Sequence, residues 1–146
     1  MTMGRLPDDW ALPAITPTNE RWFTTGELAI QRCESCQTMQ HPPEEVCRAC
    51  GAAELSHTIV RPVGTVHSYT IAHYAVHPAL ANSIPYAVVL VSPDDAPHIR
   101  VLGNMPDTPV GDVRIGLAVE AVWEERTAED GTLIRLPQWK IARSGT

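Results

Sequence analysis

Two Cys-x-x-Cys pairs, Cys33–Cys36 and Cys47–Cys50, constrain the fold of this 146-residue chain more than any other feature. They contain all four of its cysteines, and ten residues separate the inner two. A Cys-x-x-Cys turn aims both sulfurs at one point, and two such turns form a closed tetrahedral thiolate cage that suits Zn²⁺. The spacing therefore predicts a structural zinc site with no open position for a substrate. The predicted metal ligands are Cys33, Cys36, Cys47 and Cys50.

Three other chemistries use paired cysteines. Two disulfides fit poorly, because nothing else in the chain indicates export to an oxidising compartment. A redox-active Cys-x-x-Cys would not need a second copy. An iron site of the rubredoxin type uses the same four thiolates, so the sequence leaves iron open beside zinc.

The length predicts one ordinary domain, or one medium domain that carries a small appendage. No apolar run approaches the ~20 residues that a membrane span needs, so no membrane association is expected. The first residues lack a basic stretch followed by an apolar one, so we expect no signal peptide and a reducing, cytoplasmic location. The predicted organisation is an N-terminal arm and helix at 1–32, a zinc ribbon at 33–58 and a barrel at 59–146.

The charge balance argues against nucleic acid as a partner. The formal net charge is −6, and the eleven Lys and Arg residues are scattered rather than clustered. Binding to a phosphate backbone depends on clustered basic side chains. One Phe and three Tyr also provide no ladder on which bases would stack. A nucleic-acid-binding module therefore stays a minority alternative.

Hydrophobic periodicity predicts a mainly β protein. Residues 1–17 suggest an extended arm anchored by Trp10, Leu12 and Ile15, followed by a short helix that Thr18 caps and Gly26 ends. A strand at 28–32 leads into the first cysteine pair. Five further strands suit a small barrel of the OB type, because its first strand is long and bent, and Gly64 is expected to mark that bend or a bulge. These five strands are expected at 60–76, 86–92, 98–102, 117–125 and 133–141.

Few other residues suggest chemistry. His67, His73 and His77 share one face of a strand, but residues six apart on a strand are ~20 Å distant, so a second metal site is not favoured. The other three histidines are expected to be solvated; they are His41, His57 and His98. No nucleophile motif or phosphate-binding glycine loop is present, so no catalytic residue is predicted. Three tryptophans are candidates for core packing or for anchoring a partner; they are Trp22, Trp123 and Trp139.

The order of these motifs resembles that of the acyl-CoA-associated zinc-ribbon/OB-fold family, domain-of-unknown-function family thirty-five. The resemblance covers roughly residues 18–141, and its motifs are specific in combination rather than singly. The segments that carry it are Gln31-Arg32-Cys33-x-x-Cys36, His41-Pro42-Pro43, Cys47-x-x-Cys50-Gly51, Gly64 to Thr70, Pro85-Tyr86 and Ile115 to Glu120.

The resemblance implies a short N-terminal helix, a rubredoxin-like zinc ribbon and a C-terminal five-stranded OB-fold barrel. It implies a non-catalytic accessory subunit of a thiolase-superfamily acyl-CoA enzyme: a thiolase, an acyltransferase or a steroid side-chain aldolase. The expected partner is a thiolase-fold protein, in a hetero-oligomer, and some members of the family also accompany hydratases of the hot-dog fold. In such assemblies the barrel helps to hold the pantetheine arm of a CoA thioester.

The resemblance also implies where this ligand would lie. Pro85-Tyr86 and Gly103-Asn104 match family positions at the mouth of the barrel, so Tyr86 and Asn104 are predicted to contact the acyl-CoA or the partner. The simpler alternative is that Tyr86 is a core residue at the start of a strand. Arg100 and Arg114 are candidates for meeting the CoA phosphates. A free-standing acyl-CoA binder or enzyme remains a further alternative.

Overall fold

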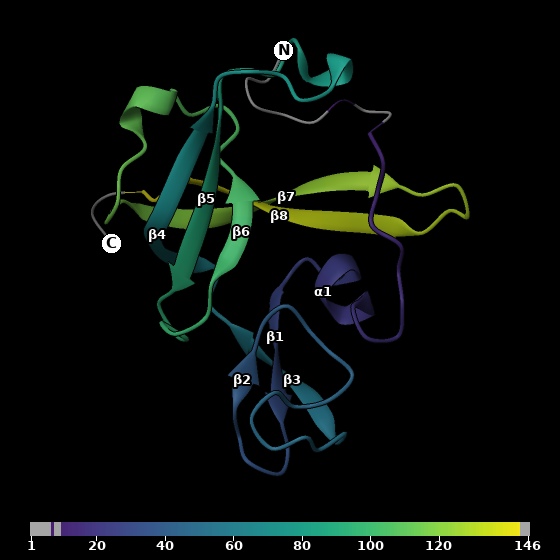
Figure 1. Cartoon of the computed structure of the whole chain (residues 1–146). Helices are drawn as coiled ribbons and strands as arrows, with labels where there is room; N and C mark the ends of the chain where they lie inside the picture. The colour runs from purple at the N-terminus through teal and green to yellow at the C-terminus, as the bar shows by residue number, and fades with distance from the viewer. Residues whose placement is uncertain (1–6, 8–9, 144–146) are drawn as a thin grey trace.

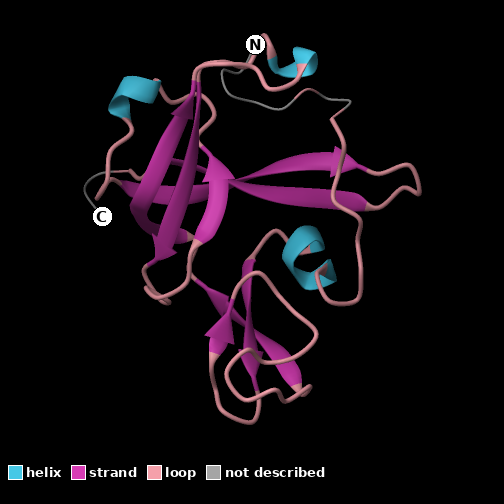
Figure 2. Ribbon diagram, viewed as in Figure 1, coloured by secondary structure: helices cyan, strands magenta, loops and turns pink. Residues whose placement is uncertain are grey.

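The computed structural model describes residue 7 and residues 10–143 and consists mainly of β-strands (Figures 1 and 2). A three-stranded sheet has the order β2-β1-β3, and a five-stranded sheet has the order β6-β5-β4-β7-β8. The predicted mainly β class with a short N-terminal helix is confirmed. The elements are α1 (Glu20–Thr24), β1 (Leu28–Cys33), β2 (Met39–Gln40), β3 (Leu55–Val60), β4 (Val63–Ala72), β5 (Tyr86–Pro93), β6 (Val101–Asn104), β7 (Ala118–Thr127) and β8 (Leu133–Ile141), with 3₁₀ turns at Pro78–Leu80 and Val110–Asp112.

Helix α1 begins one residue later than the sequence predicts. Its N-cap is Asn19 rather than Thr18. The Asn19 Oδ1 accepts a hydrogen bond from the backbone N–H of Thr16, 2.8 Å away, and so closes the turn that precedes the helix. Gly26 ends the helical segment as predicted, because its φ of +69° lies in the left-handed region that glycine adopts without strain.

The five-stranded sheet curls into the predicted OB-type barrel. Its first strand, β4, is long and pairs with both β5 and β7. In Figure 1, β4, β5 and β6 lie side by side while the β7–β8 hairpin extends away from them. The backbone N–H of Asn104 on β6 donates to Gln138 Oε1 on β8, at 2.6 Å, and so joins the two ends of the sheet. Strand β8 has the predicted bounds.

Three local predictions about the barrel are wrong. The predicted strand at 60–76 is divided, because β3 of the smaller sheet ends at Val60 and the barrel strand β4 runs only from Val63 to Ala72. The predicted strand at 98–102 starts later, at Val101, because Ile99 is held in a turn by a hydrogen bond from its N–H to Ala96 O. The irregularity in β4 lies between Val66 and Ser68 rather than at Gly64. Gly64 is required for a different reason: a Cβ atom built there would lie 2.5 Å from the backbone oxygen of Ser92.

The close approach at Gly64 gives a testable prediction. Gly64→Ala is expected to lower the free energy of unfolding by about 1–3 kcal/mol, because the backbone of β5 must shift to admit a methyl group. Gly111→Ala is the matched control, since a Cβ at Gly111 meets nothing within 4 Å. Urea denaturation of both variants tests this prediction, and equal midpoints would contradict it.

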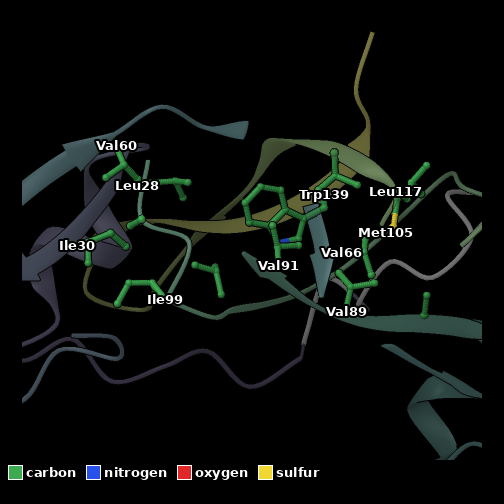
Figure 3. Close-up of a cluster of buried hydrophobic side chains, with 14 of the residues drawn as sticks. Leu28, Ile30, Val60, Val66, Val89, Val91, Ile99, Met105, Leu117 and Trp139 are labelled. Carbon is green, nitrogen blue, oxygen red and sulfur yellow. The ribbon is translucent and has the colours of Figure 1, made fainter. Parts of the chain in front are cut away.

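One hydrophobic core joins the two sheets. Leu28, Ile30 and Val60 of the smaller sheet belong to the same buried cluster as the barrel residues. Figure 3 shows them at one end of this cluster, with the fully buried Trp139 near its middle. Trp22 is also buried, and Trp123 is partly buried against the cluster. The three tryptophans therefore pack against the core rather than project into solvent.

The N-terminal arm is described from Trp10 onward, apart from residue 7. Its three predicted anchors are half-buried, as expected of side chains that hold an arm against a surface; they are Trp10, Leu12 and Ile15. The remainder of the predicted arm lies outside the described residues. Among the helices of the described part, none is long and apolar enough to cross a membrane.

Candidate metal centre and ligand groove

The two cysteine turns have the same backbone geometry. In the first, the N–H of Gln37 donates to Cys33 O, and in the second the N–H of Gly51 donates to Cys47 O, both at 2.9 Å. Gln37 and Gly51 both adopt positive φ, at 68° and 78°. Each turn thus folds back four residues after its first cysteine, which directs the sulfurs of the turn to the same side.

The structure brings all four predicted metal ligands together. Their Sγ atoms all lie within 4.8 Å of one another. The Sγ atoms of Cys33 and Cys50 are 3.6 Å apart, as are those of Cys36 and Cys47. Four Zn–S bonds of about 2.3 Å in a tetrahedron place the sulfurs about 3.8 Å apart, so the donor set fits such an ion. The cysteines are therefore arranged as a zinc-ribbon site.

Local hydrogen bonds favour the thiolate at Cys36, whereas at Cys50 the hydrogen bond from Ala52 is outweighed by the neighbouring thiols and by burial, which raise the pKa to about 12. The backbone N–H of Ala49 donates to Cys47 Sγ at 3.3 Å. Thr38 Oγ1 lies 3.1 Å from Cys36 Sγ, and this contact, together with the Thr38 backbone, lowers the pKa of Cys36 to about 6. Metal ligation needs the deprotonated sulfur, so Cys36 is suited to become the first thiolate.

Two buried glutamines fix the spacer between the cysteine pairs, and the sequence did not reveal them. Gln40 Nε2 donates to Gln31 Oε1 at 2.7 Å, which joins β2 to β1. The Gln31 side chain also bonds both backbone groups of Glu44, each at 2.8 Å. Gln40 binds the Val46 oxygen at 3.1 Å and the Arg48 N–H at 2.9 Å. The spacer is thus held by buried side-chain amides. The polar Gln31, directly after the apolar run Leu28–Ile30 and two residues before Cys33, was the available signal.

Tyr86 and Asn104, the two positions expected at the barrel mouth, line the same groove. The groove has a volume of about 760 Å³ and lies between α1, the ribbon, the N-terminal arm and the barrel. None of the described residues that line it is Asp, Glu, Lys or Arg. We call it the apolar groove; its other lining residues include Trp10, Trp22, Phe23, His41, Val88 and Leu102.

Asn104 is held rigidly in this groove. Its Nδ2 donates to Ala87 O at 2.9 Å, and its backbone N–H donates to Gln138 Oε1. Tyr86 is the first residue of β5 and is half-buried. It therefore also occupies the position expected of a residue that packs at the start of a strand. Arg100 and Arg114, the candidates for CoA phosphates, lie in two different grooves.

Two of the three histidines expected to be solvated, His41 and His57, are instead half-buried, and only His98 is exposed. His41 is half-buried against Trp22, with ring centroids 4.2 Å apart, rather than solvated. Its Nδ1 is buried without a hydrogen-bond partner among the described residues, as is His57 Nε2. Burial, and then the charge of Arg48, lower the pKa of His41 to about 4, so His41 is neutral at pH 7.

The three histidines considered for a second metal site do not converge on one point. His67, His73 and His77 are exposed. His77 Nδ1 instead accepts a hydrogen bond from the N–H of Ala79 at 3.0 Å. The four cysteines are the one group of three or more candidate ligands that converges within the described residues.

Family models match both halves of the chain. Residues 24–56 match the model for the rubredoxin-like zinc ribbon domain of ChsH2, and residues 58–124 match the model for its C-terminal OB-fold domain. These matches agree with the two sheets and confirm the predicted zinc ribbon and OB-fold barrel.

Two curated relatives match much of the chain in sequence. A protein described as a probable enoyl-CoA hydratase alpha subunit, from Thermomonospora curvata, is 34% identical over 122 residues, which are 80% of this chain. The chain spans 36% of the length of that relative. A DUF35 domain-containing scaffold protein from Methanocaldococcus jannaschii is 31% identical over 101 residues, which are 68% of this chain and 69% of that protein.

A solved structure has the same fold over nearly the whole chain. It is described as the Ltp2-ChsH2(DUF35) aldolase, and it matches with a TM-score of 0.75 and 32% identity. The match covers 90% of this chain and 100% of the other. The identity, the coverage and the four convergent cysteines agree, and this chain belongs to the DUF35 family of zinc-ribbon/OB-fold proteins that includes ChsH2.

Proposed function

We propose that this protein is a non-catalytic accessory subunit of a thiolase-superfamily acyl-CoA enzyme, which it stabilises and whose acyl-CoA channel it helps to form. The observation that carries the proposal is the likeness, at 32% identity, to the DUF35 chain of an aldolase complex. Family membership supports an accessory role in an aldolase-type complex. The thiolase fold of the partner and the contribution to its channel are the finer parts of the proposal.

Zinc is the proposed metal, held by the four cysteines. When bound, the ion supplies four bonds that join the two cysteine turns, with no position left for a substrate. The spacing of the sulfurs, near that of a zinc tetrathiolate, supports zinc. Metal analysis of the purified protein separates zinc from iron, which binds the same ligands. Ligation of the ion requires all four cysteines to be reduced, which suits a reducing, cytoplasmic location.

The apolar groove is the proposed place for the arm of a CoA thioester. Tyr86 offers a flat apolar face with one hydroxyl group, and Asn104 is fixed by two hydrogen bonds beside it. The absence of ionised side chains among the described lining residues suits an uncharged pantetheine arm. The relative described as an enoyl-CoA hydratase subunit supports a CoA thioester as the ligand class.

Co-purification tests the accessory role. The tagged chain is expressed together with a thiolase-fold protein encoded beside its gene, and the eluate is analysed for both chains and for metal. We expect a stable hetero-oligomer, with acyl-CoA turnover that requires both chains. Turnover by the isolated chain would instead support a free-standing enzyme. The same experiment with a neighbouring hot-dog-fold hydratase tests the second partner, which the likeness to the hydratase subunit favours.

A substitution at Tyr86 separates binding from folding. Tyr86→Ala is expected to leave the fold intact and to weaken acyl-CoA binding by the complex about tenfold, because a half-buried aromatic face is lost from the groove. Tyr69→Ala is the matched control, since the 39% exposed Tyr69 lies outside the groove. Titration calorimetry with an acyl-CoA measures both. Equal affinities in the two variants would remove Tyr86 from the proposed site.

A further inference from the structure

A second, smaller groove adjoins the apolar groove at the junction of ribbon and barrel. It has a volume of about 360 Å³ and is lined by the second cysteine turn, by β2 and by the segment that precedes β6. Its basic side chains are Arg48, His98 and Arg100, so we call it the basic groove. His41 lines both grooves, so the two grooves are neighbours at this residue.

The charge of the basic groove is opposite to that of the chain as a whole. The protein has seventeen acidic residues and a net charge of −6, but neither Asp nor Glu is among the described residues that line this groove. The groove that contains Arg114 differs, because Asp94 and Glu120 also line it. An anion entering the basic groove would meet cations without a competing carboxylate in the wall.

Arg100 is held in place without being neutralised. Its Nη1 donates to Pro97 O at 2.7 Å and to Ile99 O at 3.0 Å. These are uncharged partners, and no described carboxylate forms an ion pair with Arg100 within 4.0 Å. Arg48, by contrast, is already paired with Glu44 at 2.8 Å. A guanidinium that is fixed by carbonyls and keeps free N–H groups is suited to bind phosphate through charge-assisted hydrogen bonds.

We propose that the basic groove binds the phosphorylated end of the ligand whose apolar arm lies in the apolar groove, with Arg100 as the main phosphate contact. The inference rests on the proposed function, because it takes the same CoA thioester as the ligand. The uncharged pantetheine arm would lie in the apolar groove, and the phosphates would lie in the basic groove on the other side of His41. Of the two arginines that could contact the CoA phosphates, we therefore assign this role to Arg100 and not to Arg114.

Binding to the full-length, zinc-loaded chain tests the inference. Titration calorimetry compares CoA, pantetheine and inorganic pyrophosphate at low and moderate salt. Arg100→Gln is expected to weaken CoA binding at least tenfold and to leave pantetheine binding unchanged, whereas Arg114→Gln leaves both unchanged. CoA affinity should also fall with added salt, and pantetheine affinity should not. Unchanged pantetheine binding shows that Arg100→Gln is folded.

A second variant introduces repulsion without disturbing the bonds of Arg100. Ala49 is exposed and lines the basic groove, and only its backbone contacts Cys47 Sγ. Ala49→Glu is therefore expected to weaken CoA binding at least fivefold and to spare pantetheine. The inference is overturned if the chain binds no CoA, if Arg100→Gln and Arg114→Gln have equal effects, or if pyrophosphate binds as tightly as CoA. Co-purification with the partner is scored separately, so a complex that forms while these results fail leaves the accessory role standing.

Discussion

Cys47→Ser is expected to abolish stoichiometric metal binding and to leave much of the protein insoluble. Cys47 is 2% exposed, and a serine hydroxyl is a poor replacement for a thiolate ligand. Structural zinc sites contribute on the order of 10 kcal/mol of apparent binding energy in small domains, which exceeds what the ribbon gains from its own short strands. The loss of stability should extend to the barrel, because Leu28 and Ile30 of the ribbon sheet pack into the common core.

The measurements for this variant are metal content by elemental analysis, soluble yield and recovery of the partner complex. We expect zinc per chain to fall from about one to near zero, with at least a tenfold drop in the complex recovered. Ala49→Ser is the matched control, since it adds the same hydroxyl two residues away without removing a ligand. A zinc-free Cys47→Ser protein that still formed a fully active complex would refute the structural role of the metal.

Local patterns predicted most of the metal site and the barrel. The Cys-x-x-Cys pairs identify four converging sulfurs, because the geometry of each turn is determined within a few residues of sequence. The strand at Leu133–Ile141 was predicted with its bounds, because it lies between a turn and the end of the apolar pattern. The Gly26 stop likewise depends on one residue and its backbone conformation.

Contacts between distant segments were not predictable in the same way. The burial of His41 depends on Trp22 of α1, nineteen positions earlier in the chain. The side chains of Gln31 on β1 and Gln40 on β2 form a hydrogen bond with each other. From a single sequence, glutamines at these positions would be expected at the surface. The two grooves are formed by segments from both halves of the chain, so their charge and their proximity at His41 emerge only in three dimensions. Tyr86 and Asn104 were selected by family resemblance. Both line the apolar groove, which is a physical reason to consider them together.

The stability of the protein should fall as the pH is lowered, and His41 is expected to contribute a measurable part of that fall. Burial lowers the pKa of His41 to about 4 in the folded protein, against about 6.5 in the unfolded chain. Between these values the unfolded state binds the proton and the folded state does not, so acidification favours unfolding. The stability from this group is complete above pH 6.5 and is lost as pH falls toward 4. The expected loss is about 2 kcal/mol at pH 5 and about 3 kcal/mol below pH 4.

His41→Phe is the test, because phenylalanine retains an aromatic ring against Trp22 and cannot take up a proton. The free energy of unfolding, measured with urea at pH 7.5 and at pH 5, should fall by about 2 kcal/mol less in His41→Phe than in the unsubstituted protein. Protonation of the cysteine thiolates weakens metal binding in both proteins alike, so it cancels in this difference. His98→Gln, which removes an exposed histidine from the adjoining basic groove, should retain the full acid sensitivity. If His41→Phe lost as much stability at pH 5 as the unsubstituted protein, the buried neutral imidazole would not contribute to the acid sensitivity.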